Sequence, residues 1–212
     1  MSIPASARAR LDALCAEHPV LAGVERAAGP LAWRVRPRGF PGLLQAIVSQ
    51  QISTAAAAAI WRRLHGLPGA LVPGGLLMLG DEALRGAGLS RPKVAHARAL
   101  AAAFVSGQLE DAALARSGDA EAIAAIAAVR GLGPWSAEVF LLFAHERVDV
   151  FPAGDVALQA ATADLYGLRG RPGGAALREF AERWRPSRAL AARLLWHHWR
   201  YRTGRPTMDD AP

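Results

Sequence analysis

Two glycines and a proline stand together in AIAAVRGLGPWSAEVFLLFA, residues 125–144, and their spacing favours phosphate binding. Gly131 and Gly133 allow backbone angles that are closed to other residues, and Pro134 suits the first turn of a helix. Two helices would meet here in a tight helix-hairpin-helix turn. The N–H groups at the start of the second helix would then offer a phosphate site that reads no sequence. The alternative is a plain corner between two helices, in which glycine only allows close packing.

A carboxylate follows downstream, in DVFPAGD at residues 149–155. Asp155 directly precedes the helical pattern VALQAATADLYGL, so it stands at an N-cap position. The helix dipole and backbone N–H donors keep a carboxylate ionised at such a position. The helix expected over 134–145 would fold back and bring Asp155 near the phosphate-binding end of the hairpin. Taken alone, an N-cap aspartate is more often only structural.

Helices must position these residues, because the sequence favours helix almost throughout. Ala, Leu and Arg are good helix formers, β-branched runs are scarce, and glycine or proline clusters recur at intervals typical of helix ends. Ser53 and Ser90 each precede a helical pattern and are predicted N-caps. We therefore expect an all-α fold, with only residues 31–37 irregular or extended. The expected helices cover residues 4–16, 40–51, 54–65, 74–78, 81–86, 91–105, 110–116, 119–129, 134–145, 155–166, 174–183 and 187–203.

The composition fits a globular protein that binds a polyanion. The 212 residues carry 25 basic and 18 acidic side chains, a formal net charge of +7, and 52% of the residues are hydrophobic. This length is enough for one large or two small domains. Clustered cations favour nucleic-acid phosphates as partners. The alternative is an α-helical scaffold whose arginines reflect only genome composition.

Several classes of protein are excluded by the sequence. The single cysteine, Cys15, rules out a disulfide framework, a cysteine zinc site and a four-cysteine iron–sulfur cluster. The apolar runs are too short to span a bilayer, and no apolar signal segment follows the first arginines. We expect a protein that binds no membrane and stays in the cytoplasm.

Five segments carry a family resemblance. They are LLQAIVSQQIS (43–53), GLSRPK (88–93), VRGLGPWSAEVFLLFA (129–144), DVFPAGD (149–155) and RPSRALAARLLW (185–196). Together they make the chain resemble the helix-hairpin-helix DNA glycosylase superfamily, and within it the AlkA-type 3-methyladenine DNA glycosylases, over residues 40–199. The resemblance implies two helical subdomains that flank a cleft. It also implies excision of a damaged base that is flipped out of duplex DNA.

The resemblance assigns roles to individual residues. Asp155 would be the catalytic carboxylate, which stabilises the positive charge that develops on the deoxyribose. Gln51 would be the wedge that enters the gap left by the flipped base. Three residues would hold a phosphate through their backbone N–H groups: Gly131, Gly133 and Ser136. Three backbone carbonyls would share a structural Na⁺ or K⁺ ion, with no other cofactor required: Ala127, Val129 and Leu132.

The implied base pocket has tryptophan walls, because electron-rich indole faces stack well on positively charged alkylated purines. The wall residues are Trp135 and Trp196, with Gln50 beside them. Family members often have further aromatic residues where this chain has Val139 and Val156. The smaller side chains suggest a wider pocket that admits bulkier alkyl lesions.

The position after Pro134 distinguishes two chemistries. Relatives that also cut the DNA strand carry a lysine there to form a Schiff base, whereas this chain has Trp135 and a single lysine, Lys93. We therefore expect hydrolysis of the N-glycosidic bond without AP lyase activity. The enzyme would act as a monomer on double-stranded DNA that contains alkylated bases.

One glycosylase unit is expected over residues 1–212, built from two lobes. Residues 1–53 with 146–212 would form one lobe, and residues 54–145, with the hairpin at 125–144, would form the other. Two other functions stay open. One is excision of an oxidised or deaminated base such as 8-oxoguanine or uracil, and the other is noncatalytic DNA binding through the hairpin.

Overall fold

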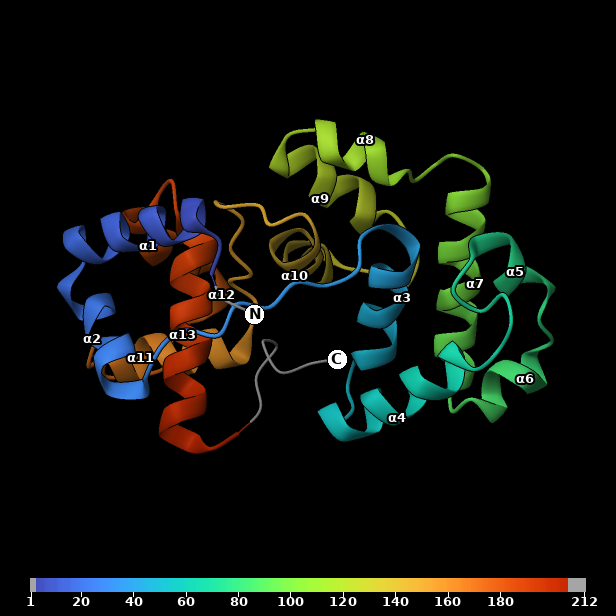
Figure 1. Cartoon of the computed structure of the whole chain (residues 1–212), viewed down its shortest axis with the longest axis horizontal. Helices are drawn as coiled ribbons and strands as arrows, with labels where there is room; N and C mark the ends of the chain where they lie inside the picture. Colours follow the sequence, from blue (N-terminus) through green and yellow to red (C-terminus); the bar gives the residue numbers. More distant parts are fainter. Residues whose placement is uncertain (1–2, 206–212) are drawn as a thin grey trace. The chain divides into compact units, whose positions relative to one another are not determined.

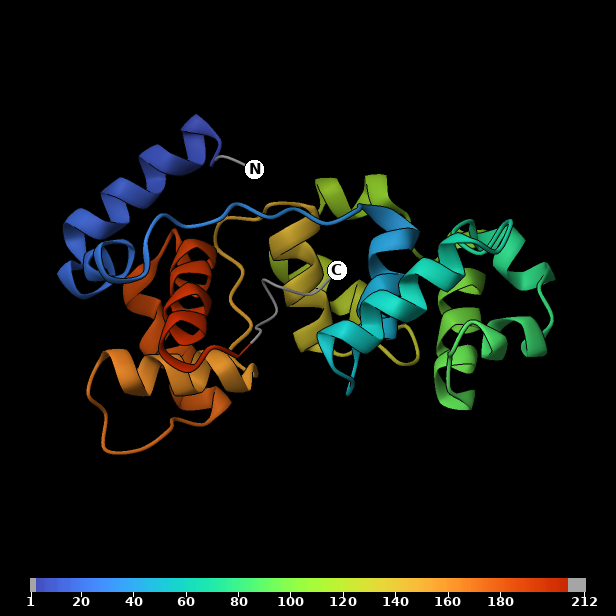
Figure 2. The ribbon, with the colours of Figure 1, turned by 60° about the horizontal axis from the view of Figure 1, so that its bottom comes forward.

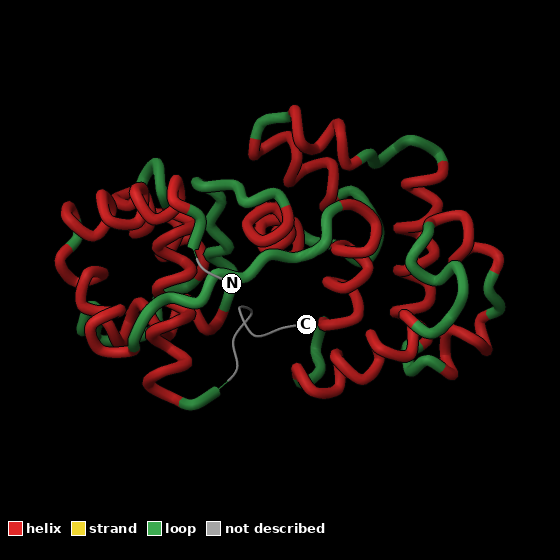
Figure 3. Tube along the Cα trace, viewed as in Figure 1, coloured by secondary structure: helices red, strands yellow, loops and turns green. Residues whose placement is uncertain are grey.

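Helices joined by loops make up residues 3–205, the range that the computed structural model describes (Figure 3). This part of the chain contains no strand, which confirms the predicted all-α class. Residues 31–37, where a strand was allowed, have no regular structure. Within the same range, no helix has both the length and the apolar character needed to cross a membrane.

The described residues divide into two compact units. The first unit comprises residues 3–35 and 146–205, and the second comprises residues 36–145. The helices of the first unit are α1 (Ala5–Glu17), α2 (Pro19–Ala28), α11 (Val156–Leu165), α12 (Gly174–Ala181), the 3₁₀ helix η1 (Glu182–Trp184) and α13 (Arg188–Thr203). Those of the second are α3 (Gly39–Ser49), α4 (Thr54–His65), α5 (Pro73–Met78), α6 (Asp81–Gly86), α7 (Arg91–Val105), α8 (Asp111–Arg116), α9 (Asp119–Ala127) and α10 (Pro134–Ala144).

The first unit is built around α13, which packs against α2 and α11 (Figures 1 and 2). Trp196 on α13 is fully buried, as is Trp184 of η1. Aromatic rings complete this core: the Tyr166 and Phe180 ring centroids lie 5.0 Å apart, edge to face. The Phe151 and Trp184 centroids lie 5.6 Å apart. The loop that leads into α11 therefore starts from a rigid aromatic core.

The second unit is built around α3, which packs against α4, α7 and α10. Helix α9 packs on α10, and α5 packs on α7. Every residue from Ser136 to Ala144 is buried, which includes two phenylalanines and two leucines. Helix α10 thus runs through the core of its unit, and its N-terminus is held firmly by that packing.

The N-cap signals in the sequence located two helices correctly. The Ser53 hydroxyl accepts the N–H of Ala56 at 3.2 Å, and the Ser90 hydroxyl accepts the N–H of Lys93 at 3.4 Å. Helices α4 and α7 begin and end at the predicted residues.

Helix α2 is missing from the sequence prediction. It starts with Pro19 at its first position and buries Leu21 and Val24, three residues apart, against α13. The segment also contains Gly23 and two valines, which lower helix propensity. Tertiary packing on α13 outweighs that weak local preference.

The boundary between the two lobes lies earlier than predicted. It falls between Val35 and Arg36, not between Ser53 and Thr54. The reason is that α3 buries its apolar face against α7 and α10 of the second unit. The predicted lobes also included residues 1–2 and 206–212, which lie outside the described residues.

Candidate functional site

The hairpin turn consists of residues 128–133, between α9 and α10. Gly131 has a φ of +92°, and a Cβ there would lie 2.2 Å from Cγ of His96. Both the backbone angle and the space therefore require glycine. Leu132 is buried between the two helices that the turn joins. Gly133 differs from the prediction: its φ of −121° is open to any residue, and a Cβ there would meet nothing within 4 Å.

The N-terminus of α10 carries the predicted phosphate-binding groups. Gly133 is its N-cap and has no side chain to cap it. The first backbone hydrogen bond of the helix runs from the Ala137 N–H to the Gly133 carbonyl at 3.0 Å. The N–H of Ser136 precedes that bond, so it belongs to the first-turn donors at the positive end of the helix dipole.

Gln50 connects the end of α3 to this hairpin. Its side-chain amide donates to the Gly131 carbonyl at 3.0 Å and to the Ser136 hydroxyl at 3.4 Å. The motifs SQQIS and GLGPWS thus meet through one side chain. The sequence placed Gln50 beside the base, and its bonds to the hairpin were not predicted.

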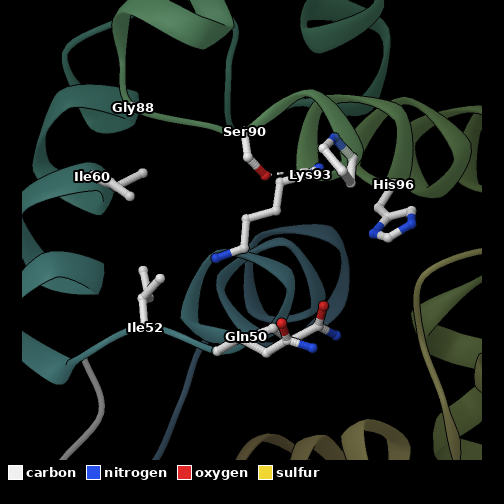
Figure 4. Close-up of a pocket in the computed structure, with 9 residues that line it drawn as sticks. Gln50, Ile52, Ile60, Gly88, Ser90, Lys93 and His96 are labelled. Atoms are coloured by element: carbon white, nitrogen blue, oxygen red, sulfur yellow. Dashed lines mark hydrogen bonds between the residues drawn. The ribbon is translucent and has the colours of Figure 1, made fainter.

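The residues after Gln50 form an exposed turn. Gln51 is exposed and has a φ of +56°, in the left-handed region that non-glycine residues rarely adopt. Gln51 is one of the residues that line a cavity of about 350 Å³, which Figure 4 shows. The residues that line it come from the turn, α4, the loop between α6 and α7, and the start of α7: Gln50, Gln51, Ile52, Ile60, Gly88, Ser90, Pro92, Lys93 and His96. The Lys93 amine lies in this cavity and donates to the Val48 carbonyl at 2.7 Å.

Asp155 lies in the first unit, at the N-cap of α11 as predicted, and is only 7% exposed. Its Oδ1 accepts the N–H of Leu158 at 3.0 Å and the indole N–H of Trp196 at 3.1 Å. Two donors on one oxygen fix the orientation of the carboxylate. The predicted approach of Asp155 to the hairpin stays a prediction.

Two further contacts hold the loop that carries Asp155. The buried amide of Gln159 donates to the Ala153 carbonyl at 3.0 Å. At the other end of the loop, Oδ1 of Asp149 accepts from the Arg188 guanidinium Nε at 3.0 Å. Asp149 and Arg188 both lie in motifs noted in the sequence, but 39 residues separate them. No local pattern reveals such a pairing.

Two predicted pocket residues are placed differently by the structure. Trp196 has 0% exposure, so no face of its ring is available for stacking on a base. The prediction that it forms a pocket wall is therefore wrong. Trp196 is instead a hydrogen-bond partner of Asp155. Val139 is buried in the core on α10, so it does not line a pocket either. Trp135 is half-buried at the start of α10, and Val156 beside Asp155 is 58% exposed.

A model of the HhH-GPD superfamily of base excision DNA repair proteins matches residues 44–186, about two thirds of the chain. The chain belongs to this superfamily. The matched range includes the HhH-GPD hairpin and Asp155, which confirms the resemblance that the sequence motifs indicated.

Curated relatives of this HhH-GPD protein include repair glycosylases. DNA-3-methyladenine glycosylase 1 of Schizosaccharomyces pombe is 29% identical over 161 residues, which is 74% of this chain and 71% of the relative. The DNA-3-methyladenine glycosylase of Saccharomyces cerevisiae is 32% identical over 129 residues, 56% of this chain and 44% of the relative.

Solved structures share the fold over nearly the whole chain. A DNA-3-methyladenine glycosidase from Bacillus halodurans matches with a TM-score of 0.78 and 31% identity, over 92% of this chain and 90% of that chain. The 3-methyladenine DNA glycosylase of S. pombe, solved in complex with abasic DNA, matches with a TM-score of 0.76 and 25% identity, over 92% and 95%.

Proposed function

We propose that this HhH-GPD protein is a monofunctional DNA glycosylase that releases alkylated bases of the 3-methyladenine type from duplex DNA. The observation that carries the proposal is Asp155, a nearly buried carboxylate held by the N–H groups of Leu158 and Trp196. The names of the relatives support the substrate class.

Asp155 supplies the negative charge that the reaction needs. An N-glycosidic bond inside the base stack cannot be reached, so the nucleotide is first flipped out of the duplex. The C1′–N bond then breaks, and its electron pair leaves with the base, which alkylation has made a better leaving group. Positive charge develops on the sugar, and a fixed carboxylate stabilises it without reorganisation. Water adds to C1′ and loses a proton, which leaves an abasic site.

The hairpin would hold the DNA backbone. The N–H groups of Gly131, Gly133 and Ser136 are the proposed phosphate donors. They belong to the turn before α10, to its N-cap and to its first turn, and this N-terminus has no side-chain cap. The carbonyls of Ala127, Val129 and Leu132 are the proposed ligands of an alkali cation. The Val129 oxygen already accepts the Leu132 N–H at 3.0 Å and keeps a second lone pair, so it suits such an ion. The cation would offset the partial negative charge of these carbonyls in the turn where the phosphate binds.

Trp135, Val156 and Gln51 are the pocket and wedge residues that the geometry still supports. The ring of Trp135 is half-buried, the side chain of Val156 is exposed beside Asp155, and Gln51 is exposed at the tip of its turn. Only Val156 can now contribute to the expected widening of the pocket, because Val139 is in the core. We infer from this small side chain that bulkier alkylated bases enter as well.

The proposal includes the absence of strand cleavage. Trp135 follows Pro134 where a Schiff-base lysine would be needed, and Lys93 is the only lysine in the chain. The Lys93 amine is hydrogen-bonded to the Val48 carbonyl, so it is committed to a structural contact. The enzyme would act as a monomer, because one site serves one lesion.

Base release from duplexes with single lesions tests the function. The panel should contain alkylated, oxidised and deaminated bases, each incubated with wild type, with Asp155→Asn and with Glu82→Gln, a control at an exposed carboxylate. We expect release of alkylated bases, seen as strand breaks only after alkali, and a loss of about 100-fold in Asp155→Asn with DNA binding retained.

Other results would change the assignment. Release of only an oxidised or deaminated base would reassign the lesion class. Strand breaks without alkali would show lyase activity. DNA binding with no release of any base would favour the noncatalytic function.

A further inference from the structure

The turn that presents Gln51 needs support from its surroundings. Helix α3 ends at Ser49, and the chain leaves it at Gln50 in an extended conformation, with φ of −60° and ψ of 131°. Gln51 then adopts a φ of +56°. A left-handed residue that is not glycine costs about 1 kcal/mol and persists only where the structure around it holds it in place.

Two side chains fix the segment that contains this turn: Gln50, within the turn, and Lys93, which binds the end of α3 before it. Gln50 itself is bonded to the hairpin through the Gly131 carbonyl at 3.0 Å. The Lys93 amine donates to the carbonyl of Val48, in the last turn of α3, at 2.7 Å. The last carbonyls of a helix lack partners within the helix, and a cation at this end is favoured by the helix dipole.

Lys93 makes this contact across the cavity that it lines. Its side chain reaches across the 350 Å³ cavity toward α3 (Figure 4). None of the nine lining residues has a carboxylate, so the lining offers the Lys93 amine no acidic partner. The amine instead binds the carbonyl end of α3. Partial burial lowers the pKa of the Lys93 amine from its ordinary value of 10.5.

We propose that Lys93 is a positioning residue that fixes the strained turn at residues 50–52, so that Gln51 can occupy the gap left by a flipped base. The proposal rests on the proposed function, because it takes Gln51 as the wedge. Lys93 acts through the end of α3 and does not touch the reacting atoms.

A double-mutant cycle tests whether Lys93 acts through Gln51. The variants are Lys93→Met, Gln51→Ala and the double variant, with Arg116→Met as a control that removes one exposed positive charge from the same unit. The readout is the single-turnover rate of base release at saturating enzyme. We expect Lys93→Met to slow wild type by about tenfold and to slow the Gln51→Ala enzyme by less than about twofold. Arg116→Met should match wild type. Full additivity of the two losses would overturn the proposal.

A second readout separates this proposal from the proposed function. In the Asp155→Asn background, 2-aminopurine placed beside the lesion reports base flipping by fluorescence without any chemistry. We expect Lys93→Met to reduce the fluorescence rise on binding, and Lys93→Arg, which keeps a cationic donor, to restore most of it. An undiminished rise in a folded Lys93→Met protein overturns the positioning role. A wild type that flips but releases no base contradicts the proposed function alone. If Lys93→Met does not fold, Lys93→Gln is used for both readouts.

Discussion

The indole N–H of Trp196 donates to Oδ1 of Asp155 at 3.1 Å, and the same oxygen accepts the backbone N–H of Leu158 at 3.0 Å. One donor comes from α13 and the other from the first turn of α11, so the carboxylate is fixed by two helices that pack together. Trp196 is fully buried, which shields this hydrogen bond from water. A shielded bond to a charged group is stronger than an exposed one.

Trp196→Phe should reduce the rate of base release and leave folding largely intact. The ring is kept, but Oδ1 of Asp155 loses one donor, and a hydrogen bond to a charged group contributes about 1.5–3 kcal/mol. We expect the single-turnover rate to fall by about 10-fold, with DNA affinity unchanged. Trp184→Phe, at an equally buried tryptophan of the same unit, is the matched control. Equal rates in the two variants would show that the indole N–H of Trp196 has no role.

The two hairpin glycines should respond differently to substitution by alanine. Gly131→Ala places a Cβ against His96 at a φ of +92°, so we expect a loss of about 2 kcal/mol or more in unfolding free energy, together with weaker DNA binding. Gly133→Ala meets no atom within 4 Å and should change stability by less than about 0.5 kcal/mol. Urea denaturation of both variants, followed by binding to an undamaged duplex, measures the difference. Similar destabilisation by both substitutions would contradict the geometry of the turn.

Gln51→Gly should separate stability from activity. Glycine adopts a φ of +56° without strain, although its flexible unfolded state offsets that gain, so we expect unfolding free energy to change by less than about 1 kcal/mol. Base release should fall by about tenfold, because the proposed wedge is gone. Denaturation curves and single-turnover rates from the same preparation measure the two effects. An unchanged rate would remove Gln51 as the wedge.

The ion pair between Arg8 and Glu25 should make stability depend on acid pH. Hydrogen bonds from Arg8, and then the N–H of Leu31, lower the pKa of Glu25 from its usual 4.5. A lowered pKa in the folded state stabilises the fold above the unfolded value, and this contribution is lost as pH falls below about 4.5 toward the folded pKa.

Glu25→Gln tests that pH dependence. It should cost about 1–2 kcal/mol at pH 7 and make the decline in stability between pH 5.5 and pH 3 shallower than in wild type. Denaturant unfolding at several pH values measures both. If unfolding free energy falls with pH in parallel for the two proteins, Glu25 does not contribute to the pH dependence of stability.

Local signals predicted most of the helices. Ser53 and Ser90 cap α4 and α7 through hydrogen bonds to residues three positions away, and a contact of that range can be inferred from the sequence. Helix α2 could not be predicted in this way, because its stability depends on packing against α13, far away in the sequence.

The site was predicted in its positions and less well in its contacts. The N-cap role of Asp155 and the glycine requirement at Gly131 follow from neighbouring residues and are present in the structure. The burial of Trp196 and its bond to Asp155 depend on how α11 packs on α13, and the resemblance alone suggested a stacking wall instead.

The interrupted first unit has a consequence for how the protein is made. Its helices α1 and α2 are made before the second unit, whereas α13, against which α2 packs, is made after it. The second unit is continuous from residue 36 to residue 145 and can fold as soon as it emerges. The carboxylate of Asp155 acquires its donor from Trp196 only after α13 has been made. A nascent chain can therefore have a folded hairpin before the Asp155 carboxylate is fixed by both of its donors.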